Sequence, residues 1–117
     1  MSKLRIREEE IRKPRKVPME DRERVIDIIR SILLEDNRVK LAVVHGGFIN
    51  SEVFRDIDLA LLLEDVGDEL TYIEELRDRL EKATGIGVDI QLLNKAPPSF
   101  TYRVLHTGKV LVEREPG

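Results

Sequence analysis

Apolar residues recur along the chain with two periods, and each period predicts a different kind of element. From residue 19 to 35 they return every three or four positions behind an acidic first turn, which predicts an amphipathic helix. The same spacing follows Asp68, a residue type that caps helices, and stops at Gly85, which predicts a second helix. Short apolar or alternating runs predict buried strands, and these runs cover residues 40–45, 56–63, 87–93 and 109–113.

Turn residues separate these elements and set their order. Gly46-Gly47 ends the first strand, residues 48–55 have room for one or two helical turns, and Pro97-Pro98 opens a turn with space for a short helix to His106. The order of elements predicts an α/β (α+β) fold, in which helices pack on a small mixed sheet. A chain of 117 residues has room for one hydrophobic core and not for two.

Composition narrows the class of protein. Hydrophobic residues make up 41% and charged residues 37% of the chain, so we expect a folded domain with a highly charged surface. The absence of cysteine excludes disulfides, cysteine-based zinc sites and thiol nucleophiles. The many charges and few Asn and Gln are typical of proteins from hot habitats. Because no apolar run approaches about 18 residues and the first residues have no apolar signal core, we expect a soluble, cytoplasmic protein without a membrane span.

The net charge of −3 is unevenly divided along the chain. Residues 1–17 hold seven Lys or Arg against three Glu, a net charge of +4, which leaves −7 on residues 18–117. We therefore divide the chain into a basic N-terminal arm (1–17) and one domain (18–117). The arm either grips phosphate groups or an acidic partner, or it is a solvated tail or an added edge strand, which is the simpler interpretation. The acidic body argues against nucleic acid as a direct partner, because such binding needs many phosphate contacts.

Three aspartates mark the candidate site. Asp56 and Asp58 are two residues apart in a predicted strand, so both side chains project from one face. Asp89 lies on the polar face of a later strand and joins them if the two strands are neighbours. Close carboxylates repel one another unless a cation lies between them, and Mg²⁺ binds carboxylates together with substrate phosphates. Three carboxylates could hold two such ions for a displacement at phosphorus.

Gly46-Gly47 supplies the second part of the candidate site, because glycine lets backbone N–H groups approach phosphate oxygens closely. Each feature alone has a simpler interpretation, since a glycine pair is usually a turn and Asp-x-Asp at a strand start is usually a turn or cap pair. Their succession within about fifty residues is what indicates a phosphate and metal site. His45 could touch a phosphate, but a strand-end histidine beside the core is the simpler interpretation.

These features resemble the minimal nucleotidyltransferases of the DNA polymerase beta superfamily. The matching pieces are Gly46-Gly47, Asp56-Ile57-Asp58-Leu59 and Asp89, and residues 103–114 look like the closing segment of these small domains. The resemblance covers residues 20–114 and implies the palm-like fold of polymerase beta. It also implies that Gly46 and Gly47 bind the triphosphate of ATP and that Asp56 and Asp58 ligate Mg²⁺. Asp89 would hold a second ion or orient the acceptor hydroxyl.

Stand-alone members of this size are commonly encoded beside a HEPN-domain protein, as the antitoxin of a toxin–antitoxin pair. The resemblance therefore implies an enzyme that transfers AMP from ATP to a tyrosine hydroxyl of a HEPN-domain toxin. The accessory domain that larger relatives use for nucleic acid is missing, which fits a protein acceptor. The sequence leaves a homo-oligomer open.

The chain departs from the family pattern at three places. Gly47 stands where most active members have Ser, eight residues without a glycine separate Gly47 from Asp56, and Arg55 stands where a small residue is usual. Arg55 is a candidate nucleotide-binding residue that could clamp a phosphate, or it forms a surface salt bridge. Two alternatives therefore stay open: a non-catalytic module that neutralises a partner by contact, and nucleotidyl transfer to a small molecule or RNA.

Overall fold

The computed structural model describes residues 14–115, and its elements follow the predicted order. The helices are α2 (Met19–Leu34), α3 (Gly47–Asn50), α4 (Glu69–Thr84) and α5 (Pro98–Thr107). The strands are β1 (Arg15–Lys16), β2 (Val39–His45), β3 (Val53–Phe54), β4 (Asp56–Leu63), β5 (Gly87–Leu92) and β6 (Lys109–Glu113). The two long helices and the four strands of the prediction are confirmed to within one residue at each end. None of the helices in this range is long and apolar enough to cross a membrane.

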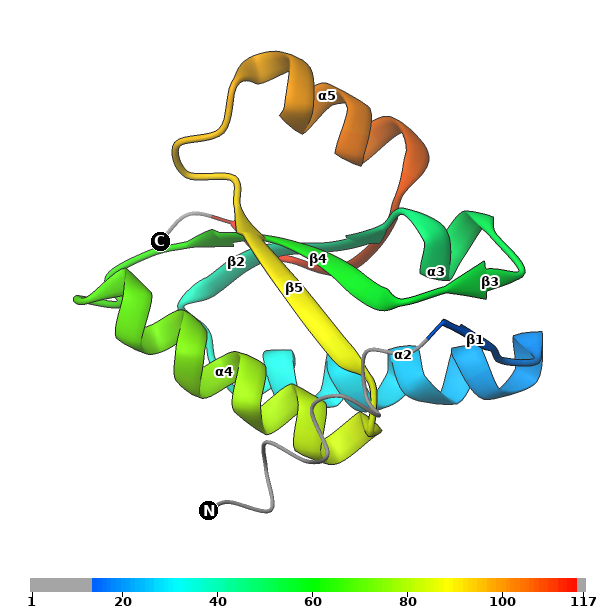
Figure 1. Cartoon of the computed structure of the whole chain (residues 1–117). Helices are drawn as coiled ribbons and strands as arrows, with labels where there is room; N and C mark the ends of the chain where they lie inside the picture. The colour runs from blue at the N-terminus through cyan, green and yellow to red at the C-terminus, as the bar shows by residue number, and fades with distance from the viewer. Residues whose placement is uncertain (1–13, 116–117) are drawn as a thin grey trace.

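Four strands form one mixed sheet in the order β5-β4-β2-β6 (Figure 1). β2 pairs antiparallel with both β4 and β6, whereas β4 and β5 run parallel because the crossover helix α4 connects them. α2 and α4 lie on one face of this sheet, and α5 lies on the other (Figure 1). The predicted α/β fold, a small mixed sheet with helices packed on it, is confirmed.

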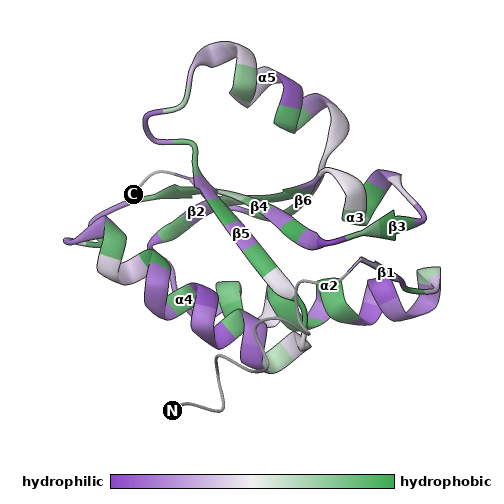
Figure 2. Cartoon of the chain, viewed as in Figure 1, coloured by the Kyte–Doolittle hydropathy of each residue, from purple (hydrophilic) through white to green (hydrophobic). Residues whose placement is uncertain are grey.

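Alternation along the strands divides the core into two layers. The larger layer lies between the sheet and α2 and α4, and its fully buried members include Ile29, Leu33, Ile57, Leu59, Leu61, Leu80 and Val88. The smaller layer lies under α5 and contains Val43, Ala60, Leu93 and Val104. Since neighbouring strand residues point to opposite faces, Asp56 and Asp58 share the α5 face with Ala60. Figure 2 shows the hydrophilic residues of β4 gathered at the strand end nearest α3 and β3.

The ends of α4 follow the capping residues predicted for them. Asp68 Oδ1 accepts a hydrogen bond from the Leu70 backbone N–H at 3.1 Å, and Gly85 ends the helix with a φ of 73°. Both geometries are typical of helix ends. Because β5 begins only two residues after Gly85, the helix returns the chain directly to the sheet beside β4.

The predicted basic arm can be placed only at its end, because residues 1–13 lie outside the described residues. Residues 15–16 form β1, which pairs antiparallel with β3. The end of the arm is therefore a short strand, and the role of the arm as a whole stays a prediction. β3 follows the glycine turn and α3 and directly precedes β4, so the β1–β3 pairing joins the end of the arm to the segment that leads into the candidate site.

Candidate functional site

The turn after β2 is built around a glycine for two reasons. Gly46 has a φ of 76° and a ψ of −153°, a backbone conformation that L side chains rarely adopt. A Cβ atom added there would lie 2.3 Å from Oδ2 of Asp58, so this carboxylate packs directly against the turn. The glycine predicted to approach phosphate groups is therefore also the residue that admits Asp58 to its position.

Gly47 has a different environment. Its φ is not positive, and an added Cβ would lie 3.4 Å from Cβ of Phe54, which is an ordinary contact distance. The turn around it closes with hydrogen bonds from the Ile49 and Asn50 backbone N–H groups to the Gly46 carbonyl oxygen, both at 3.0 Å. Position 47 thus has room for a serine, and neither backbone conformation nor crowding requires glycine there.

A buried arginine of α2 donates hydrogen bonds to the loop that follows the glycines. Arg22 of α2 is 5% exposed, and its guanidinium group lies 5.1 Å from the centre of the Phe54 ring. It donates hydrogen bonds at 2.8, 2.8, 2.6 and 2.6 Å to the backbone carbonyls of Val17, Phe48, Ser51 and Glu52, respectively. One cation therefore fixes the path of the chain from α3 to β3.

The sequence did not point to Arg22, because a charged residue in an amphipathic helix is usually in solvent. A signal for its burial was present, since Arg22 lies four residues before Ile26 and seven before Ile29, on the buried stripe of α2. A charge on an apolar stripe indicates a partner inside the protein. Here the partners are backbone carbonyls, which no side-chain pattern could have revealed.

The strand register brings the predicted carboxylates to one face of the sheet. Asp58 pairs with Asp89 of β5 and with His45 of β2, so the three side chains form a row across adjacent strands. Asp56 precedes this row by two residues on the same face, opposite Gly87, which has no side chain. β4 and β5 are thus neighbours, which is the condition under which Asp89 joins Asp56 and Asp58.

Gln91 connects the members of this row. Its Nε2 donates hydrogen bonds to Oδ1 of Asp58 at 3.2 Å and to Oδ2 of Asp89 at 3.0 Å. Its Oε1 lies 2.6 Å from Nε2 of His45. Nothing in the sequence assigned a role to Gln91, although it lies two residues after Asp89 and therefore on the same polar face of its strand. That alternation was the available signal, and only the strand order showed that one amide could reach all three groups.

The two carboxylates fit a hard divalent cation. Oδ1 of Asp58 and Oδ2 of Asp89 converge on the same nitrogen atom of Gln91, and Mg²⁺ needs only one or two carboxylates when phosphates and water complete its shell. No group of three or more His, Asp or Glu side chains between residues 14 and 115 is arranged to hold a metal ion by itself. Oxygen atoms of a substrate would therefore have to complete a metal site here.

The charge of Asp58 is poorly compensated. Burial raises the pKa of its carboxyl group, and the neighbouring carboxylates of Asp89 and Asp56 raise it further, while His45 and the hydrogen bond from Gln91 oppose the change. The ion pairs among the described side chains include none between Asp58 or Asp89 and a Lys or Arg. A cation bound at this point would relieve the repulsion.

The two remaining candidates differ in their surroundings. Arg55 is exposed directly before Asp56, and it takes part in none of the ion pairs found within residues 14–115. His45 is half-buried at the end of β2, with the Phe100 ring of α5 edge-on at 5.9 Å. His45 is therefore a strand-end histidine beside the smaller core layer, as expected, and it also reaches the carboxylates through Gln91.

Several solved structures share this fold. One chain of the complex of tri-AMPylated Shewanella oneidensis HEPN toxin with MNT antitoxin aligns with a TM-score of 0.62 and 25% identity, over 79% of this chain and 72% of that one. A toxin–antitoxin structure with AMP-PNP aligns with a TM-score of 0.59 and 25% identity, over 80% of this chain and 74% of that one. A minimal nucleotidyltransferase aligns with a TM-score of 0.62 and 24% identity, over 79% and 94% of the two chains, and shows the shared fold alone.

Sequence comparison gives the family. No curated protein sequence matches the chain significantly. The model of the family described as polymerase beta, nucleotidyltransferase, matches residues 27–117, a range that contains the glycine turn and all three aspartates. The chain therefore belongs to the polymerase beta nucleotidyltransferase family.

Proposed function

We propose that this protein is a Mg²⁺-dependent nucleotidyltransferase that transfers AMP from ATP to a tyrosine hydroxyl of a HEPN-domain toxin, and so acts as its antitoxin. The observation that carries the proposal is the convergence of Asp58 and Asp89 on one point beside the Gly46 turn. Phosphate and metal chemistry need these two parts next to each other. The likeness to a chain from an AMPylated toxin–antitoxin complex and to a complex with AMP-PNP supports the choice of donor and acceptor.

Each part of the site has a role in this proposal. Asp56, Asp58 and Asp89 would hold Mg²⁺, which when bound neutralises charge on the phosphates and on the leaving pyrophosphate. Gly46 and Gly47 would let the backbone approach the triphosphate, since no side chain intervenes at either position. Arg55, exposed beside Asp56, would pair with a phosphate oxygen.

The reaction is a substitution at the α-phosphorus of ATP. The tyrosine oxygen forms a bond to this phosphorus as the bond from the phosphorus to the bridging oxygen of pyrophosphate breaks. The hydroxyl loses its proton to solvent, and Asp89 would orient the hydroxyl for attack.

A contact-only antitoxin is the second candidate. Gly47 favours it, because the backbone and the space at this position would accept the serine of most active members, yet the hydroxyl is absent. The three carboxylates on one face count against it, because such groups repel one another without a cation.

Calorimetry separates the two candidates. The full chain should bind Mg²⁺·ATP at tens of micromolar protein, and Asp58→Asn should lose this binding. Asp78→Asn is the matched control, because Asp78 is exposed on α4 and pairs with Lys82. Incubation with ATP and a HEPN-domain protein encoded next to this chain should then add the mass of one or more AMP groups to that partner. Absence of Mg²⁺·ATP binding by the wild type would exclude the enzyme, whereas binding with an unmodified partner would favour another acceptor.

A further inference from the structure

The Gln91 side chain spans the middle of the sheet. β4 lies between β5, which carries Gln91, and β2, which carries His45. Gln91 is in register with Ala60 of β4, and this small buried residue leaves room for the amide to pass over the strand. The amide therefore links three strands at the point where the predicted carboxylates meet.

The hydrogen bonds fix the orientation of this amide. A flipped amide would turn its oxygen toward the carboxylates of Asp58 and Asp89, which also carry negative charge, so the NH₂ group must face them. The amide oxygen then accepts from His45, which must carry its proton on Nε2. The contact of His45 with the Phe100 ring holds the imidazole in place. Gln91 is thus anchored at one end and donates at the other.

The donating end lies where a cation would be needed. Among the described side chains, the hydrogen bonds to Asp58 and Asp89 come from this one nitrogen. It is a neutral donor between two acidic groups, so it reduces their repulsion without cancelling it. The oxygen atoms that would take a cation together are the same atoms that now accept from Gln91.

We propose that Gln91, anchored by His45, is a displaceable latch: it holds Asp58 and Asp89 together before Mg²⁺ binds, and it releases them when the ion takes its place. This inference rests on the proposed function and adds a positioning residue to it. The latch stabilises the metal-free state, and its hydrogen bonds are lost on binding, so it weakens the cation affinity of the site.

Removal of the amide should strengthen metal binding. Gln91→Met keeps the length of the side chain and removes both donors, so the metal-free carboxylates repel each other and gain more from a cation. We expect Gln91→Met to bind Mg²⁺ or Mn²⁺ about tenfold more tightly than the wild type, a factor that corresponds to about 1.4 kcal/mol. His45→Phe keeps a ring against Phe100 but removes the anchor, and it should give a smaller increase in affinity.

Isothermal titration of the full chain with each metal, without nucleotide, tests the latch. Asn37→Met is the matched control. Asn37 is an exposed amide in the turn before β2, whereas the site lies at the opposite end of that strand. Thermal melting in EDTA gives a second readout, in which Gln91→Met should melt lower than the wild type and regain the difference when Mg²⁺ is added.

The outcomes are distinct. Tighter metal binding by Gln91→Met supports the latch, and so does binding by this variant alone. Equal or weaker binding by the variant overturns the latch while the proposed function stands. If neither protein binds either metal without nucleotide at millimolar concentration, the latch is overturned, whereas the proposed function fails only if Mg²⁺·ATP does not bind either.

Discussion

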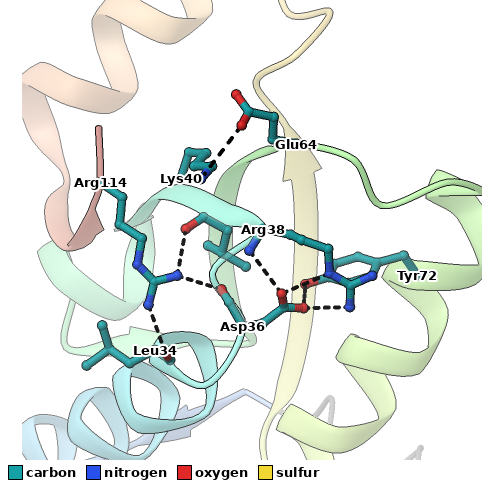
Figure 3. A network of polar contacts seen from close by, with 8 residues as sticks. Leu34, Asp36, Arg38, Lys40, Glu64, Tyr72 and Arg114 are labelled. Atoms are coloured by element: carbon teal, nitrogen blue, oxygen red, sulfur yellow. Dashed lines mark hydrogen bonds and ion pairs between the residues drawn. The ribbon is translucent and has the colours of Figure 1, made fainter. Parts of the chain in front are cut away.

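Two polar clusters lie near opposite ends of β2, and their carboxylates are held in different ways. At the start of the strand, Asp36 accepts hydrogen bonds from Nε and Nη2 of Arg38, both at 2.9 Å, and from the Tyr72 hydroxyl at 2.7 Å (Figure 3). Arg114 covers the same loop by donating to the Asp36 carbonyl oxygen at 2.7 Å. At the end of β2, Asp58 and Asp89 share one neutral amide. The first cluster contains its own cation, Arg38, whereas no Lys or Arg among the described residues pairs with Asp58 or Asp89 in the second.

The pKa values of the two carboxyl groups, Asp36 and Asp58, move in opposite directions. Hydrogen bonds from Arg38 hold the pKa of the Asp36 carboxyl well below its usual range. Burial raises the pKa of Tyr72, and its hydrogen bond to Asp36 adds to this, so the phenol stays protonated. Burial instead raises the pKa of Asp58. Structural carboxylates are thus stabilised in their charged form, whereas the candidate ligand is not.

The largest loss of stability should come from the cation that supports the site without touching its carboxylates. Arg22→Met leaves four backbone carbonyls without their donor, in a region where water cannot fully replace it. We expect a loss of about 3 kcal/mol or more of unfolding free energy, measured by urea denaturation. Arg24→Met on the same helix is the control, because Arg24 is exposed and pairs with Asp21 at 3.5 Å. Equal losses for the two variants would show that Arg22 does not hold the loop.

Neutralising one aspartate in each cluster tests the comparison directly. Asp36→Asn removes charge-assisted hydrogen bonds and should lower the unfolding free energy by about 1–2 kcal/mol at pH 7. Asp58→Asn removes a poorly compensated charge and should shift the urea midpoint upward in EDTA, while it abolishes Mg²⁺·ATP binding. Similar losses of stability in both variants would mean that both clusters serve to stabilise the fold.

The pH dependence of these two differences should be opposite in sign. The folded-state pKa of Asp36 is depressed, so its contribution is present above the unfolded-state pKa of about 3.9 and is lost as the pH falls further. The folded-state pKa of Asp58 is raised, so its contribution is present at low pH and is lost as the pH rises through that pKa. Urea unfolding from pH 7 to pH 3 should therefore show the deficit of Asp36→Asn shrinking and the advantage of Asp58→Asn disappearing. Parallel profiles for both variants would contradict the assignment.

The comparison also shows what sequence could and could not predict. Hydrophobic periods placed the long helices and the sheet strands, and strand alternation placed Asp56 and Asp58 on one face. These features are local, because each depends on spacing within a single element. The succession of Gly46-Gly47 and the three aspartates carried the resemblance, which the family match confirmed.

The missed features depend on contacts between distant segments. β4 lies between the strands of Gln91 and His45. Gln91 reaches across it to His45 because β4 presents the small Ala60 at the crossing point. Arg22 lies on the buried stripe of α2, but it finds partners there only because the loop after α3 turns its carbonyl oxygens toward this helix. No pattern within one element encodes either arrangement, since both require the strand order and the path of a loop to be known.

The smallest effect on stability should come from position 47, where the sequence departs from its family. An added Cβ would lie 3.4 Å from Cβ of Phe54 and the φ of Gly47 is not positive, so Gly47→Ser should change the unfolding free energy by less than about 1 kcal/mol. The new hydroxyl can donate to a phosphate oxygen, and we expect Mg²⁺·ATP to bind several-fold more tightly in calorimetry. Gly46→Ser is the contrasting variant, because its side chain would collide with Asp58 at a positive φ and should abolish binding. If Gly47→Ser binds no better than the wild type, the missing hydroxyl does not limit this site, and the backbone of the turn suffices for the phosphates.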